Sequence, residues 1–194
     1  MAMKKVDELK KIFVGPKSVM YTSKVVDFDG TSLDVTPEAE FPVKVDSLKA
    51  TMDDPTINHY KIIGKAGDWA TTSELGDFNV EMVVPTNAKE ALVMMFGADA
   101  VKEIAKLTLK TGNTGLDATT GFGGVALEQT KYKMTGTIVI VDETETNLMV
   151  ITNLALYATL QYDEPGSAPV AFKLSGSIEG AGKKSVAWFS KNAG

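Results

Sequence analysis

The sequence predicts a mainly β protein, an antiparallel β-sandwich or barrel with one main helix at about 87–107. Several separate runs alternate apolar and polar residues with a period of two, as half-buried strands do. Only one stretch carries apolar residues at helical spacing. The chain has 194 residues, of which 44% are hydrophobic, and this is enough to bury a core without disulfides or a metal ion.

The first part of the chain is a short charged arm at about 1–17, followed by strands. A run at 41–45 alternates apolar and polar residues, and Pro42 within it indicates an edge strand or the start of a strand. A second alternating run covers 78–84 and stops at a proline. The apolar residues of the two runs are Phe41, Val43, Val45, Phe78, Val80, Met82 and Val84.

The helix is predicted from apolar residues that recur at i, i+3, i+4, i+7 and i+8 over 88–96. Asn87 and Glu90 have the spacing of a capping box. A glycine interrupts the pattern, which then resumes over 101–105. We therefore expect one interrupted helix or two short ones within 87–107, packed by one face onto the sheet.

The strands after the helix form a predicted hairpin and two further elements. Apolar residues share a face over 132–140 and again over 148–160, with an acidic turn between them, which is typical of a long antiparallel hairpin. Gly136 predicts a bulge or a close backbone approach in the first of these runs. Further strands are expected at 170–178 and around 186–188.

Two stretches are rich in polar and turn-forming residues. The first, 50–76, contains Asp-Asp-Pro and several glycines, and the second, at about 108–126, combines glycines with threonines. We expect the second to be a mobile loop. Because no domain boundary is visible, the predicted organisation is a single domain over 1–194.

Composition excludes many kinds of chemistry. Without cysteine, the chain has no disulfide, thiolate metal site or cysteine nucleophile, and its one histidine, His59, excludes a two-histidine metal motif. All twenty basic residues are lysines, and the net charge is −5. Sequence-specific binding of nucleic acid is therefore not expected. No signal peptide or membrane-spanning stretch is visible, so we expect a protein that stays soluble in the cytoplasm where it is made.

The motifs that resemble active sites lack their required context. Gly121-x-Gly123-x-x-Ala126 matches a permissive dinucleotide fingerprint, but no hydrophobic strand precedes it and no helix follows. His59 has no partners of a catalytic triad in the sequence around it, which favours a loop or packing role. We therefore predict no enzyme activity, no catalytic residue, no bound metal and no cofactor.

Taken together, the order of the elements resembles that of the major tail (tail tube) proteins of long-tailed bacteriophages. The resemblance spans about 18–189 and is one of order and composition, without a catalytic-type signature. It lies in ATMDDP at 50–55, IIGKAGDW at 62–69, GDFNVEMVVP at 76–85, the helix at 88–96, and FKLSGSIEG at 172–180.

This resemblance implies a structural virion protein whose subunits form hexameric rings stacked into a tube. Its partners would be further copies of itself and other tail proteins, such as the tape measure and tail-end proteins. DNA would pass through the lumen during ejection without sequence-specific binding, and no membrane is involved. The protein would be assembled in the host bacterial cytoplasm and end in the virion tail. An acidic, arginine-free chain suits this role because it would not hold phosphates.

Two other functions stay open. One is a monomeric β-sandwich binding or accessory module of adhesin type, and the other is a carboxylate-dependent hydrolase. For the tube function, 51–69 and 108–126 are the expected contacts between subunits, because both are long for connections in a compact β domain. The predicted contact residues are Thr51, Asp53, Asp54, Ile57, His59, Tyr60, Trp69, Gly112, Gly115, Gly121, Phe122 and Gly123.

Overall fold

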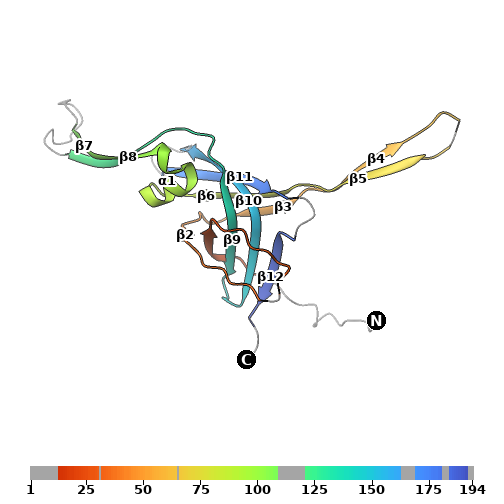
Figure 1. Cartoon of the computed structure of the whole chain (residues 1–194), viewed down its shortest axis with the longest axis horizontal. Helices are drawn as coiled ribbons and strands as arrows, with labels where there is room; N and C mark the ends of the chain where they lie inside the picture. The colour runs from red at the N-terminus through yellow and green to blue at the C-terminus, as the bar shows by residue number, and fades with distance from the viewer. Residues whose placement is uncertain are drawn as a thin grey trace. The chain divides into compact units, whose positions relative to one another are not determined.

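The computed structural model describes residues 13–30, 32–64, 66–108, 121–162, 169–180 and 184–191. Strands make up 53% and helix 7%, in antiparallel sheets with one α-helix among the described residues, so the predicted mainly β fold is confirmed (Figure 1). The chain divides into two compact units, and each is described by itself. The first holds 1–43, 135–154 and 179–194, and the second holds 44–134 and 155–178.

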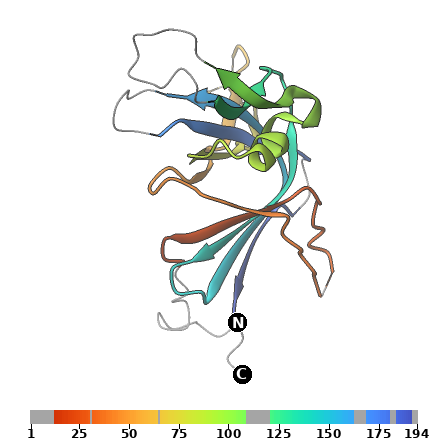
Figure 2. The same ribbon diagram turned by 90° about the vertical axis from the view of Figure 1, so that its left-hand side faces the viewer.

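The first unit is built on an antiparallel sheet. Its strands are β1 (Pro16–Thr22), β2 (Ala39–Phe41), β9 (Met134–Asp142), the first half of β10 (Asn147–Gln161) and β12 (Val186–Ser190). They lie side by side in the order β2–β1–β9–β10–β12 (Figure 2). The core face of this sheet carries fully or almost fully buried side chains, which include Val19, Ile138, Ile140 and Ile151.

The predicted hairpin is formed by β9 and β10, and Asp142 organises its turn. Oδ1 of Asp142 accepts hydrogen bonds from the backbone N–H groups of Thr146 (3.0 Å) and Asn147 (3.1 Å). Oδ2 accepts from the Thr144 hydroxyl (2.8 Å) and the Asn147 side-chain amide (2.7 Å). Burial raises the pKa of this carboxyl, but the hydrogen bonds outweigh burial and lower it to about 2. The turn is therefore built around a charged carboxylate.

Gly136 lies where the backbone of β9 comes close to the end of β1. Its φ of 148° lies in a region that side chains disfavour, and a Cβ atom there would overlap the carbonyl oxygen of Thr22. The close backbone approach predicted at Gly136 is therefore confirmed.

Two buried threonines attach the segment after β1 to the hairpin. The Thr137 hydroxyl donates to the carbonyl oxygen of Lys24 (2.7 Å) and lies 2.8 Å from the Thr152 hydroxyl. The Thr152 hydroxyl oxygen in turn accepts from the backbone N–H of Val26 (2.8 Å). These bonds satisfy polar groups inside the unit and fix the start of the segment that leads to β2.

The second unit holds the helix and the remaining strands. They are β3 (Lys49–Met52), β4 (Thr56–Tyr60), β5 (Ala70–Glu74), β6 (Phe78–Val84), α1 (Lys89–Phe96), the 3-10 turn η2 (Ala98–Ala100), β7 (Val101–Thr108), β8 (Gly121–Leu127) and β11 (Ala171–Ile178). The second half of β10 begins a sheet with the order β10–β11–β6–β3, while β4–β5 and β7–β8 form two separate two-stranded sheets. The strand predicted at 78–84 is confirmed, with Val80, Met82 and Val84 fully buried on one face.

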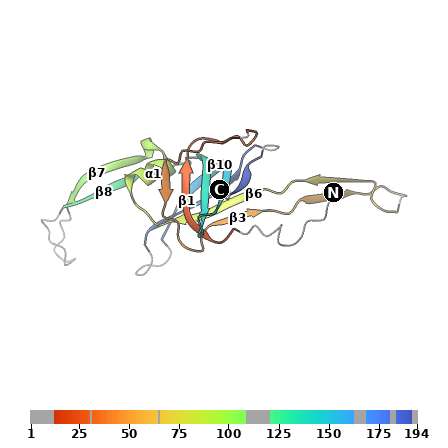
Figure 3. The same cartoon turned by 90° about the horizontal axis from the view of Figure 1, so that it is seen from below.

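The helix α1 packs onto this sheet by one face, as predicted. Leu92, Met95 and Phe96 are its buried residues. The ring of Phe96 meets that of Phe172 on β11 edge to face, with ring centroids 5.4 Å apart. The helix also contacts β7 (Figure 3).

The prediction of helix through 107 is wrong beyond α1. The helix ends before Gly97, whose φ of 85° breaks the helical backbone, and 101–107 belong to the strand β7. These residues form a strand because they pair with β8. The apolar spacing that suggested a helix is short, and it also fits a strand with an irregular register. The capping box at Asn87 is also wrong, since the N-cap is Ala88 and no side chain caps the helix.

The prediction of a loop over about 108–126 is wrong at its described end. Residues 121–127 form β8, which pairs antiparallel with β7, so Thr108 lies opposite Gly121. Backbone hydrogen bonds between strands need no side chains, and glycines therefore do not prevent this pairing. Residues 109–120 lie outside the described part of the chain.

Candidate assembly surfaces

In the second unit, the strand pairs β3–β6 and β4–β5 share one register and form a continuous two-stranded ribbon. Lys49 on β3 pairs with Glu81 on β6, and Tyr60 on β4 pairs with Ala70 on β5. The first strand advances by eleven residues between these two pairs and the second goes back by eleven, so the register is the same at both ends. Between these pairs, the N–H of Asp53 donates to the carbonyl oxygen of Asp77 (2.9 Å) and keeps the strands together. We call residues 49–60 and 70–81 the long ribbon; Figure 1 shows its β4 and β5 side by side.

The long ribbon requires a glycine at position 76, which lies between β5 and β6 where the two strands of the ribbon come very close. A Cβ atom at Gly76 would overlap the carbonyl oxygen of Asp53 on the opposite strand. Oδ2 of Asp53 also accepts a hydrogen bond from the side-chain amide of Asn79 (3.0 Å). At about 3.3 Å per residue, the eight residues 53–60 extend roughly 26 Å beyond β3.

One face of the long ribbon exposes large apolar side chains. Ile57 pairs with Ser73 and is 56% exposed, and Leu75, two residues after Ser73, is 88% exposed. Alternation places both on the same face, together with His59. Trp69, next to β5, is 63% exposed. Apolar side chains exposed together in this way are typical of an interaction surface.

His59 lies near the end of the long ribbon, with a carboxylate as its partner. Its Nδ1 is 2.7 Å from Oδ2 of Asp68, and the two side chains are about half and one third exposed. The contact joins β4 to the residues before β5 and so holds the connection 61–69 at its base. This pair therefore has a positional role in the hairpin.

A second exposed ribbon consists of β7 and β8, which we call the short ribbon (101–108 and 121–127). Leu107 pairs directly with Phe122, and both side chains are exposed. Nζ of Lys89 on α1 lies 2.5 Å from Oε2 of Glu103, and this exposed ion pair joins the helix to the ribbon. The short ribbon thus exposes one apolar pair, Leu107 and Phe122, a smaller apolar surface than that of the long ribbon.

The structure places most of the predicted contact residues on these two ribbons. The long ribbon or its connection carries Thr51, Asp53, Asp54, Ile57, His59, Tyr60 and Trp69; the short ribbon carries Gly121, Phe122 and Gly123; Gly112 and Gly115 lie outside the described residues. The two groups belong to separate sheets, so strand pairing does not bring them together. Sequence reasoning missed Leu75 and Leu107. Only the pairing register places Leu75 on the face of Ile57 and pairs Leu107 with Phe122.

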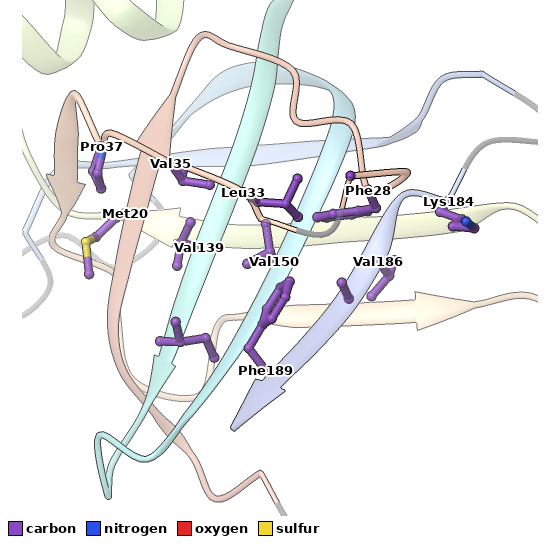
Figure 4. Close-up of a pocket in the computed structure, with 13 residues that line it drawn as sticks. Met20, Phe28, Leu33, Val35, Pro37, Val139, Val150, Lys184, Val186 and Phe189 are labelled. Atoms are coloured by element: carbon purple, nitrogen blue, oxygen red, sulfur yellow. The ribbon is translucent and has the colours of Figure 1, made fainter. Parts of the chain in front are cut away.

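The first unit contains an apolar pocket of about 770 Å³ that the sequence did not predict (Figure 4). Its lining residues are Met20, Phe28, Gly30, Leu33, Val35, Pro37, Val139, Leu148, Val150, Lys184, Val186, Ala187 and Phe189. Its one charged lining residue, Lys184, lies 2.7 Å from the carboxylate of Asp29. This hydrogen-bonded ion pair lowers the pKa of Asp29 and raises that of Lys184. Apolar residues within the otherwise polar stretch 27–37 were the signal available in the sequence.

The described residues were compared with the requirements of a metal site and of a membrane-spanning helix. Within the described ranges, no three His, Asp or Glu side chains gather as a metal site requires. Nor does the described part of the chain contain a helix long and apolar enough to cross a membrane.

Comparison with known protein families gave no match for this sequence, and comparison with curated proteins gave none either. The function is therefore inferred from the residues of this chain.

Proposed function

We propose that this chain is a structural virion protein, the protomer of a phage tail tube built from stacked hexameric rings. In this function the long ribbon contacts neighbouring subunits and the tube conducts DNA during ejection. The observation that carries the proposal is the continuous register of the long ribbon, which presents Ile57 and Leu75 on one exposed face.

The energetic argument for assembly starts from these exposed side chains. Complete burial of a large aliphatic side chain contributes about 1.5–3 kcal/mol. Each copy of the chain offers Ile57, Leu75 and Trp69 on or beside the same ribbon. A regular assembly repeats such contacts at every subunit, which offsets the cost of ordering the ribbon.

Charge supports the same function. The net charge is −5, and the chain has no arginine. A lumen built from such subunits would not attract phosphates strongly, because affinity for DNA comes largely from release of counterions by basic side chains. DNA could therefore move along the tube without being held.

Assembly of the purified full chain tests the proposal. We expect concentrated protein to form rings and tubes by negative-stain microscopy, together with species larger than a monomer in sedimentation velocity. Ile57→Asp puts a charge on the apolar face of the long ribbon. Losing about 2 kcal/mol per subunit would raise the concentration needed for assembly roughly 30-fold.

Asn58→Asp is the matched control, because it introduces the same charge one residue away on the opposite face of β4. We expect this variant to assemble as the unmodified chain does. Circular dichroism checks that both variants keep their strands. A chain that stays monomeric at high concentration, or two variants that assemble equally well, would contradict the proposal.

A second function, a monomeric binding module of adhesin type, is favoured by the apolar pocket of the first unit. Its volume of about 770 Å³ lies within the range of small-molecule sites. Sedimentation distinguishes the two functions, since this module would remain a monomer at all concentrations.

A further inference from the structure

The pocket of the first unit lies on the sheet face opposite the core. Met20 pairs with Val139, and Val150 pairs with Ala187, so these four side chains form a row across β1, β9, β10 and β12. All four line the pocket. The segment 27–37 covers part of this row with Phe28, Leu33 and Val35 (Figure 4). The cover leaves a volume of about 770 Å³ over an apolar floor.

The one charged residue that lines the pocket, Lys184, has two acidic neighbours. Lys184 forms its ion pair with Asp29, and Asp27 is close enough to add to the rise in the pKa of Lys184. Two carboxylates therefore face one ammonium group. A peptide with apolar side chains and an excess of lysine would match both the apolar lining and the two carboxylates beside Lys184.

The chain enters the first unit at one end of this same sheet. The carbonyl oxygen of Val14 accepts a hydrogen bond from the N–H of Glu143 in the β9–β10 turn (3.1 Å). Leu148 and Phe189, which line the pocket, pair with each other only a few residues beyond this turn. Twelve residues precede the first described residue, and in extended form they could reach about 40 Å.

The sequence of these twelve residues has the required chemistry. Residues 1–12 read MAMKKVDELKKI, with four lysines against one aspartate and one glutamate. Their large apolar residues, Met1, Met3, Val6, Leu9 and Ile12, are spaced between the charges. We propose that residues 1–12 occupy the apolar pocket of their own first unit, with the lysines beside Asp27 and Asp29. This proposal does not depend on the tail-tube function.

Engineered cysteine pairs test the proposal directly, because the natural chain has no cysteine. Leu33→Cys would be combined in turn with Met3→Cys, Val6→Cys and Leu9→Cys in the full chain, at low protein concentration under mild oxidation. We expect at least one pair to form a disulfide within the chain, identified by mass spectrometry. The control pair, Leu9→Cys with Thr72→Cys on exposed β5, should form none.

The other crosslinking outcomes overturn the proposal. A disulfide formed only between chains would mean that a second copy fills the pocket. No disulfide from any of the three positions would mean that residues 1–12 lie elsewhere.

Binding of Nile red, a neutral apolar dye, provides an independent measurement. A tethered segment competes at high effective concentration, so removing residues 2–12 should tighten dye binding about tenfold or more. A synthetic peptide of residues 1–13 should displace the dye from the shortened chain. Leu33→Asp in the shortened chain should weaken dye binding, which assigns the dye to this pocket. Equal dye affinity of the full and shortened chains would overturn the proposal.

Discussion

Replacing Gly76 with alanine should open the distal part of the long ribbon while leaving the rest of the second unit folded. The added Cβ atom would overlap the carbonyl oxygen of Asp53, so the two strands must separate at this point. Separation breaks the hydrogen bond from the N–H of Asp53 to Asp77 (2.9 Å) and the one from Asn79 to the Asp53 carboxylate (3.0 Å). At about 1 kcal/mol each, their loss amounts to about 2 kcal/mol.

A cost of about 2 kcal/mol corresponds to a roughly 30-fold increase in the equilibrium constant for local opening. Hydrogen exchange read by mass spectrometry measures this directly. Amides of β4 and β5 should exchange about 30-fold faster in Gly76→Ala, with those of β6 beyond Val80 unchanged. Gly124→Ala on β8 is the matched control, because nothing lies within 4 Å of a Cβ atom there. Unchanged protection of β4 and β5 in Gly76→Ala would refute the reasoning.

Four other substitutions should have distinct effects. The pKa of Asp142 falls from 3.8 to about 2 on folding, so its charge adds stability above pH 4 that is lost as the pH falls towards 2. In Asp142→Asn, the melting temperature should therefore depend less on pH over this range. Phe172→Ala removes the ring that Phe96 contacts and should cost about 3–5 kcal/mol in urea unfolding, whereas Trp188→Ala, at a 67% exposed site, should stay within about 0.5 kcal/mol. Thr152→Val leaves the Val26 N–H without its acceptor and should cost about 1–3 kcal/mol by the same measurement, and a change below 0.5 kcal/mol would count against the buried network.

The sequence predicted best those elements in which local pattern and burial agree. The alternating residues of 78–84 form β6, with Val80, Met82 and Val84 inside, because a strand with one buried face must alternate. Gly136 was recognisable for a similar reason, since a glycine within a strong apolar run indicates a close backbone approach.

The failures occurred where contacts distant in sequence decide the structure. Val101 and Ile104 have helical spacing, yet pairing with β8 makes them part of a strand. Gly121 and Gly123 suggest a loop by composition, but both belong to β8, the strand that pairs with β7. The polar stretch of the candidate surfaces was visible in the sequence, but the common register of β3–β6 and β4–β5 was not.

The pocket was beyond sequence reasoning for the same physical reason. Its floor combines Met20 and Ala187 from near the two ends of the chain with Val139 and Val150 from the β9–β10 hairpin. No local pattern marks such a row, because each strand contributes a single side chain to it.

The common register of the long ribbon also limits how its length can change through insertions and deletions. One extra residue on one strand between β3 and β4 would shift every distal partner and turn Ile57 to the opposite face. Adding two residues to each strand would keep Ile57 and His59 on their present face and lengthen the ribbon by about 7 Å. Variants of this protein that differ in ribbon length should therefore differ by even numbers of residues on both strands, while the connection 61–69 is free of this parity.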